Sequence, residues 1–433
     1  MSEETSQKGN VFAIATMFAL FFMIAFVTNF ASPMGVIAKN QFNASNALSQ
    51  LGNAANFIAY LFMGIPGGLI LKRKGYKFTA LAAVAVGFVG VGVQLISGYI
   101  SSFPVYVLGA FIAGFSMCML NLVVNPMLNT LGGGGNKGNQ LVQFGCSLNS
   151  VGATLSPAVL GWLIGEITKD TAFIKAAPAL MIAMGIFALA FVIVAFSKIP
   201  EPHMETAEEK AARLSGQTSL MKDIATTLKF RHFTLGALAI FFYIVIEVGV
   251  PSMGMLYMTD CVKNAAGEIT SKGPGYVGGA VAGVVCGAYW FLMMCGRLLG
   301  GVVGGKISSR VQVSFLASLG IALLVAVMFS PVKMITLFGY QFPLSMAFMV
   351  AVGLCTSVMW GGIFNMAAEG LGKYVPMGSG IFMCMVFGGI LIPVQGLLAD
   401  KIGILSSYWL SIGLLAYVLF YALLGSRVAK PQQ

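Results

Sequence analysis

The sequence predicts an all-α, polytopic membrane protein, and three observations carry that prediction. Of its 433 residues, 58% are hydrophobic and only 9% are charged, whereas soluble domains carry about 25% charged residues. The apolar residues gather in long runs, and about 20 such residues are what a helix needs to cross a bilayer. Glycine is abundant, with 54 residues, which suits helices that pack closely in lipid.

Twelve apolar runs follow one another, and one long polar segment interrupts them. We expect transmembrane helices near 11–37, 47–71, 78–99, 104–131, 140–165, 174–197, 233–258, 276–304, 311–331, 343–367, 378–398 and 405–426. The first run lacks a small-residue cleavage site and leads into further runs, so we interpret it as a retained helix. The polar segment 198–231 divides the spans six and six, and Glu209 and Arg213, four residues apart, predict a surface helix within it. The expected organisation is therefore a six-helix bundle (1–197), a central cytoplasmic loop (198–231) and a second six-helix bundle (232–433).

Loop charges predict the orientation. Twelve spans place both termini on one side, and the loops on that side hold 17 of the 25 Lys and Arg residues, against seven on the other. Because positive loops stay in the cytoplasm, we expect both termini to be cytoplasmic and the protein to lie in the cytoplasmic (inner) membrane. The net charge of +11 is spread over many loops, so it indicates topology and anionic lipid, and it does not favour a nucleic-acid partner.

The sequence gives little support for an enzyme or a metal centre. Six of the seven cysteines lie within apolar runs, and the two histidines, His203 and His232, lie at the central loop. This pattern excludes His/Cys metal sites and a histidine relay within the membrane. No HExxH, GxSxG or P-loop occurs. We expect no cofactor other than a coupling ion.

Motifs in both halves point to one family. The stretches "YIVIEVGVPS", "AYWFLMMCGRLLGG", "GLCTSVMWGGIFNMAAEGLG" and "GGILIPVQGLLAD", together with "GIPGGLILKRKGYK" and "NPMLNTLG" in the first half, occur in order over essentially all twelve spans. With them the chain resembles the fucose/glucose–galactose permeases of the major facilitator superfamily, which are sugar–cation symporters. The resemblance implies two six-helix bundles with a site between them at mid-membrane. It also implies import of a neutral, hexose-type monosaccharide by alternating access, coupled to Na⁺ or H⁺.

The chain departs from this family in its first half. Ser32 stands where the family usually has an Asp, Asn121 where it commonly has a Glu, and Cys146 where it has a Gln. The first half therefore has no mid-membrane carboxylate, and simple proton coupling through that half is not supported. An exporter or permease for another small solute and an uncoupled sugar facilitator stay open as alternatives. The expected partners are a monosaccharide, a coupling cation and the bilayer, with the protein as a monomer.

Glu247 is the most informative residue, because it lies near the middle of the run 233–258. An ionisable side chain at the bilayer centre costs roughly 2.5–3.5 kcal/mol on insertion scales. Two interpretations stay open: a buried structural acid, or a substrate and coupling-ion contact. As a coupling residue, Glu247 would carry a proton or help to hold Na⁺ together with the amides of the first half.

Further polar and aromatic residues within the runs are candidates for binding a hydroxyl-rich solute, with interhelical hydrogen bonding as the alternative for the amides. The predicted substrate contacts are Asn29, Asn53, Asn56, Asn121, Asn125, Gln143, Asn149, Tyr243, Glu247, Trp290, Asn365 and Gln395. Arg297 and Glu369 are placed near the cytoplasmic ends of the eighth and tenth helices, where a charge pair would act as a gate. Lys72 in "KRKGYK" stands where the superfamily usually has an Asp, in a turn that anchors orientation.

Overall fold

The computed structural model describes residues 3–28, 51–164, 173–214, 220–263 and 269–428. Within these residues the regular secondary structure is helical apart from two short antiparallel hairpins. The long apolar runs form the helices because a membrane span must satisfy its backbone N–H and C=O groups internally.

The first half consists of long helices. They are α1 (Glu3–Thr28), α4 (Leu51–Tyr99), α5 (Phe103–Leu131), α6 (Gly135–Ile164) and α7 (Ala177–Phe196), with a 3-10 turn η1 (Phe173–Ala176) before α7. Helix α4 contains two of the predicted spans. The chain reverses within it at Gly75, whose φ of 85° lies in the left-handed region that favours glycine.

Two short helices connect the halves, α8 (Ala207–Leu214) and α9 (Leu220–Lys229). The first contains both Glu209 and Arg213, so the helix predicted from their spacing is confirmed. The segment before α8 holds the turn at Gly75 in place: Glu201 accepts hydrogen bonds from the backbone N–H groups of Tyr76 and Lys77.

The second half contains more breaks. Its elements are α10 (Arg231–Thr259), β1 (Cys261–Lys263), β2 (Ile269–Lys272), α11 (Gly279–Gly304), α12 (Ser309–Phe329), β3 (Met334–Leu337), β4 (Tyr340–Pro343), α13 (Leu344–Thr356), α14 (Met359–Ala368), η2 (Gly372–Tyr374), α15 (Val375–Cys384), η3 (Met385–Leu391), α16 (Ile392–Ile402), η4 (Leu405–Ser407), α17 (Tyr408–Phe420) and the π-helix η5 (Tyr421–Gly425). The tenth predicted span is thus α13 with α14, and the eleventh is α15, η3 and α16. Pro393 lies in the first turn of α16, where its missing N–H is tolerated.

Nine helices of the described part are long and apolar enough to cross a membrane. Helix α4 counts once among them although it holds two predicted spans. The apolar part of α1, Val11–Val27, is shorter, and the run predicted to 37 continues outside the described residues. Helix α6 is not among the nine.

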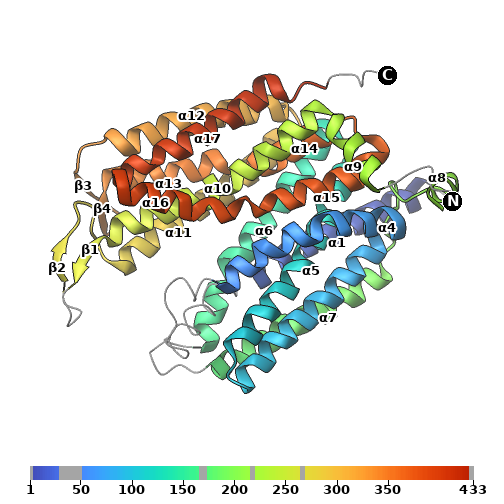
Figure 1. Ribbon diagram of the computed structural model, residues 1–433, viewed down its shortest axis with the longest axis horizontal. Helices are drawn as coiled ribbons and strands as arrows, with labels where there is room; N and C mark the ends of the chain where they lie inside the picture. The colour runs from blue at the N-terminus through green and yellow to red at the C-terminus, as the bar shows by residue number, and fades with distance from the viewer. Residues whose placement is uncertain (1–2, 29–50, 165–172, 215–219, 264–268, 429–433) are drawn as a thin grey trace.

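The buried apolar residues form two large clusters. One is built from residues between Met17 and Ile199, and the other mainly from residues between Phe233 and Ala422. Figure 1 shows the matching groups of helices, with α6 between them; the start of α1 and the end of α17 lie at one end of the molecule, and the hairpins lie at the other. We call these ends the terminus side and the hairpin side. The division into bundles at 197 and 232 stays a prediction.

The two groups of helices pack most closely toward the terminus side, through α4 against α15 and α6 against α11. A Cβ atom on Gly380 of α15 would lie 2.6 Å from the backbone oxygen of Gly64 on α4. A Cβ atom on Gly301 of α11 would lie 2.7 Å from the Phe144 ring on α6. Only glycine allows such an approach, so the halves are closed against each other on this side.

Candidate functional site

A cavity of about 220 Å³ lies between the two groups of helices. Its walls come from α1, α4, α5 and α6 on one side and from α10, α11, α14 and η3 on the other. The lining residues are Phe21, Ile24, Ala25, Phe57, Tyr60, Asn121, Cys146, Asn149, Glu247, Arg297, Trp360 and Val386. The volume is below the roughly 300–1,000 Å³ of drug-sized pockets, so the cavity suits one small solute.

A buried ion pair forms one wall of this central cavity. An Nη2–H of Arg297 donates to Oε1 of Glu247 at 2.9 Å, and the two side chains are only 9% and 13% exposed. The same guanidinium reaches the other half, where it donates to Oγ of Ser150 at 2.6 Å and to the backbone oxygen of Cys146 at 3.5 Å. The hydroxyl of Tyr289 donates to the backbone oxygen of Glu247. Arg297 therefore connects the acid of the second half to α6 of the first half.

This arrangement corrects the expected pairing of Arg297 with Glu369. Arg297 lies in the wall of the central cavity because Glu247 is the acid that faces it on the neighbouring helix α10. Glu369 lies just after α14, at the terminus side. Its side chain is exposed, and its backbone oxygen accepts a hydrogen bond from Nε2 of His232 at 2.7 Å. A gating role for either residue stays a prediction.

Two predicted amides line the cavity. Nδ2 of Asn121 donates to the Tyr60 hydroxyl and to the backbone oxygen of Met117, each at 3.0 Å. Nδ2 of Asn149 donates to the backbone oxygen of Phe21 at 3.0 Å. Oδ1 of Asn121 also accepts from Nδ2 of Asn125 at 3.3 Å. Because an amide oxygen has two lone pairs, the oxygens of both amides can still accept a hydrogen bond from a solute.

Two other amides lie beneath the cavity, one helical turn nearer the terminus side, and we call their contacts across the halves the floor. Oδ1 of Asn125 accepts from Nε1 of Trp360 at 3.1 Å, and Nε2 of Gln143 donates to the backbone oxygen of Val358 at 2.9 Å. Both bonds cross between the halves, and both amide side chains are fully buried. Asn125 and Gln143 thus hold the halves together beneath the cavity and are not part of its lining.

Four further predicted contacts lie outside the lining. Tyr243 is fully buried behind Trp360, with their ring centroids 6.5 Å apart. Trp290 is 39% exposed and packs edge-on against Tyr289. Asn56 is buried where α4 crosses Gly114 of α5, and Nε2 of Gln395 donates to Ser411 within the second half.

Asn29 lies outside the described residues, and so does the side chain of Asn53. The lining residues Tyr60, Phe21 and Phe57 were not predicted. A Tyr or Phe in an apolar run carries no signal of its own, because aromatic side chains also pack in apolar cores.

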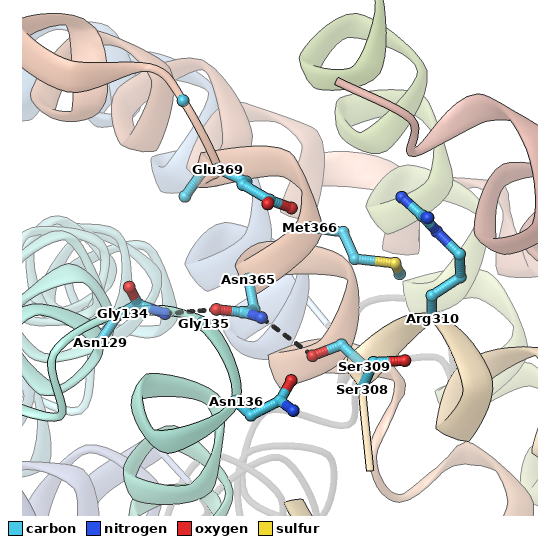
Figure 2. Close-up of a pocket in the computed structure, with 12 residues that line it drawn as sticks. Asn129, Gly134, Gly135, Asn136, Ser308, Ser309, Arg310, Asn365, Met366 and Glu369 are labelled. Atoms are coloured by element: carbon cyan, nitrogen blue, oxygen red, sulfur yellow. Dashed lines mark hydrogen bonds between the residues drawn. The ribbon is translucent and has the colours of Figure 1, made fainter. Parts of the chain in front are cut away.

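A second pocket, of about 420 Å³, lies at the terminus side between the turn before α6, the start of α12 and the end of α14. A chain of hydrogen bonds crosses it (Figure 2): Nδ2 of Asn129 donates to Oδ1 of Asn365 at 2.6 Å, and Nδ2 of Asn365 donates to Oγ of Ser309 at 2.9 Å. Asn365, a predicted substrate contact, therefore lies here and not in the central cavity. Figure 2 shows Asn136 and Glu369 on opposite sides of Asn365.

No group of three or more His, Cys, Asp or Glu side chains that could hold a metal ion occurs in the part of the chain that the structure describes. A Na⁺ ion at Glu247 would have to share the carboxylate with the Arg297 guanidinium, and two positive charges at that distance repel each other.

Two groups of helices, closed on one side and with a polar cavity between them, are typical of a membrane transport protein. The chain belongs to the Major Facilitator Superfamily, whose sequence profile matches residues 15–340. It is 27% identical over 429 residues to the glucose/galactose transporter of Brucella abortus (strain 9-941), covering 98% of this chain and 97% of that protein. It is 23% identical over 422 residues to the L-fucose-proton symporter of Escherichia coli (strain K12), covering 92% and 89%.

Among solved structures, the chain resembles the Major Facilitator Superfamily transporter FucP in the outward conformation, with a TM-score of 0.82 and 17% identity over 97% of this chain and 100% of that one. This likeness confirms the all-α fold class predicted from the sequence. The resemblance to the fucose/glucose–galactose permeases is confirmed by the full-length relatives.

Proposed function

We propose that the protein imports a neutral, hexose-type monosaccharide across the cytoplasmic membrane through the central cavity by alternating access. The observation that carries this proposal is a small cavity between the halves that combines aromatic faces, amides and an internally neutralised charge pair. The names of the relatives support the substrate class. The excess of Lys and Arg on the terminus side supports a cytoplasmic position for that side, so the closed end faces the cytoplasm and the cavity serves the outer side.

The lining suits both the apolar face and the hydroxyl groups of a sugar. The rings of Tyr60 and Trp360 offer apolar faces for the CH-rich side of a pyranose, while Asn121 and Asn149 accept hydrogen bonds from hydroxyls. Hydrogen bonds to an ionised group are about twice as strong as neutral ones, so a hydroxyl that binds the Glu247–Arg297 pair fixes the orientation of the sugar. Because its two charges cancel, the cavity favours an uncharged solute.

Solute binding is coupled to opening through residues that serve both. Trp360 lines the cavity and also donates across the halves to Asn125, and Arg297 lines it and donates across to Ser150. When a sugar hydroxyl accepts the hydrogen bond of Trp360 or Arg297, a bond to the solute replaces a bond between the halves. The floor is thereby weakened, and rocking of the halves opens the terminus side. The Glu247–Arg297 pair lies within the second half and survives this motion.

For coupling we favour H⁺ at Glu247 over Na⁺. A proton on this carboxylate removes the partner of Arg297 and leaves its guanidinium free to bind the solute, whereas Na⁺ would be repelled by it. An uncoupled facilitator is the second candidate, because a permanent Glu247–Arg297 pair needs no further ion.

Uptake of labelled D-glucose, D-galactose and L-fucose into proteoliposomes, under imposed H⁺ or Na⁺ gradients, tests this function. Trp360→Leu is expected to reduce uptake at least tenfold. The matched control Trp290→Leu, which removes the same residue type outside the cavity, is expected to stay within twofold of wild type. Glu247→Gln is expected to abolish accumulation while sugar exchange survives.

If the folded protein moves none of the three sugars, the substrate class is wrong. If both Trp variants lose uptake equally, the central cavity is not the site. If Glu247→Gln accumulates sugar fully, Glu247 is a structural acid.

A further inference from the structure

The pocket at the terminus side is larger than the central cavity, and the transport step described above does not use it. Its walls come from both halves: the turn at Gly134–Asn136 belongs to the first, and Ser308–Arg310 and Asn365–Gly370 belong to the second. A pocket built this way exists only while the two halves are together on this side. Whatever fills it must leave, or lose half of its contacts, when this side opens.

The pocket offers both hydrogen-bond donors and acceptors that the protein itself does not use. Within the described part of the chain, the Asn136 amide and the Glu369 carboxylate have no hydrogen-bond partner. Arg310 is held from behind by Ser426, to which its Nε donates at 3.0 Å and its Nη2 at 3.2 Å. The pocket thus combines an amide, one carboxylate and one guanidinium.

This chemistry selects a class of ligand. An anion would face Glu369 and a cation would face Arg310, so neither is favoured. A neutral solute with several hydroxyls can donate to Glu369 and Asn136 and accept from Asn136 and Arg310. The crossing chain Asn129–Asn365–Ser309 (Figure 2) forms a polar surface behind such a solute.

We propose that this pocket is a second solute site, which binds the transported class of neutral monosaccharide from the terminus side and thereby holds that side closed. The proposal rests on the proposed function for the identity of the sugar. Its consequence follows from linkage: a ligand that binds only the closed arrangement favours it by the factor 1 + [L]/Kd. At a sugar concentration ten times the Kd, the closed state gains about 11-fold. Imported sugar therefore slows its own further import.

Binding stoichiometry tests the second site directly. In equilibrium dialysis of the purified protein against labelled D-glucose, D-galactose and L-fucose, wild type is expected to bind two molecules of the transported sugar per chain. Asn136→Leu and Glu369→Leu are each expected to bind one. Lys137→Leu, which changes the exposed neighbour of Asn136 outside the pocket, is expected to bind two, and Asn136→Gln restores two. Trp360→Leu, in the central cavity, is expected to retain the second site alone.

Inhibition of uptake by sugar on the terminus side is a second measurement, and a purely structural role of Asn136 would not change it. In proteoliposomes that contain unlabelled sugar on the terminus side, uptake by wild type is expected to fall, and Asn136→Leu is expected to relieve this inhibition with an unchanged KM for outside sugar. One bound sugar per wild-type chain, lost in Trp360→Leu and unaffected in Asn136→Leu, overturns the second site and leaves the proposed function standing. Absence of binding and uptake for all three sugars overturns both.

Discussion

Removal of one member of the Glu247–Arg297 pair should destabilise the protein more than removal of both. In Arg297→Gln, the Glu247 carboxylate loses its partner in a wall where it is only 13% exposed. Breaking a buried ion pair in this way costs about 3–5 kcal/mol, whereas replacing both charges by neutral groups is often nearly neutral. Glu247→Gln/Arg297→Gln places two amides face to face, so it should recover most of the loss.

The size of the effect can be converted into a melting temperature. With an unfolding entropy of about 2.1 cal/mol/K per residue, a chain of 433 residues should lose roughly 3–6 °C in Arg297→Gln. Thermal unfolding of the purified protein in detergent, for the two single variants and the double variant, measures the coupling between the residues.

The matched control is the exposed pair of Lys373 and Glu209, whose Nζ and Oε1 atoms are 3.8 Å apart. Exposed pairs contribute about 0–1 kcal/mol, so Lys373→Gln should shift the melting temperature by about 1 °C or less. The reasoning is refuted if Arg297→Gln melts like wild type, or if the double variant melts as low as Arg297→Gln.

Three further predictions concern the terminus side. Nζ of Lys72 lies 2.9 Å from Oδ2 of Asp223 in α9. Lys72→Glu should therefore lower the free energy of unfolding by about 1 kcal/mol and slow uptake roughly fivefold. The reversed pair Lys72→Glu/Asp223→Lys should restore the rate of uptake. Burial lowers the pKa of His203 from 6.5. The neutral ring, which forms a hydrogen bond with Tyr76 at 2.7 Å, therefore stabilises the fold above pH 6.5, and this contribution is lost as the pH falls through the lowered pKa. Hydrogen exchange of residues 199–206 should then accelerate in wild type but not in His203→Gln. Gly380→Val forces a Cβ to within 2.6 Å of a backbone oxygen on α4, so it should lower the melting temperature by about 1–3 °C, and an unchanged value would contradict the close packing.

The fold was largely predictable because hydrophobic length alone determines what crosses a bilayer. The turn at Gly75 also fits the prediction, since "KRKGYK" interrupts two apolar runs. The hairpins β1–β2 and β3–β4 were not predicted, because strands of three or four residues lack the length that makes an alternating pattern recognisable. The break between α13 and α14 was also missed: no proline or glycine marks it in the sequence, and Ser357 and Val358 keep helical backbone angles.

The sequence predicted which types of residue line the site, but not how far along each helix the site lies. Polar residues in apolar runs identified Glu247, Asn121 and Asn149 correctly as cavity-lining residues, yet the same signal selected Asn125 and Gln143, which lie one turn lower. A sequence gives the face of a helix through its period, but the depth at which two helices meet depends on their tilt and crossing. Arg297 was misplaced for the same reason, since its distance along α11 does not reveal which acid lies beside it.

The charges of the cavity explain how the first half can lack a carboxylate. Among the lining residues, Glu247 is the single acid and Arg297 the single base, so the wall is neutral as a whole. Asn121 lies in the same cavity, and a Glu there would add a second acid to compete for the one guanidinium. Like charges in a shared, poorly solvated site disfavour each other's ionisation. With Asn121 neutral, the guanidinium is free to reach Ser150 on the opposite half. A neutral Asn121 therefore leaves Arg297 both its pair with Glu247 and its contact with Ser150 across the halves.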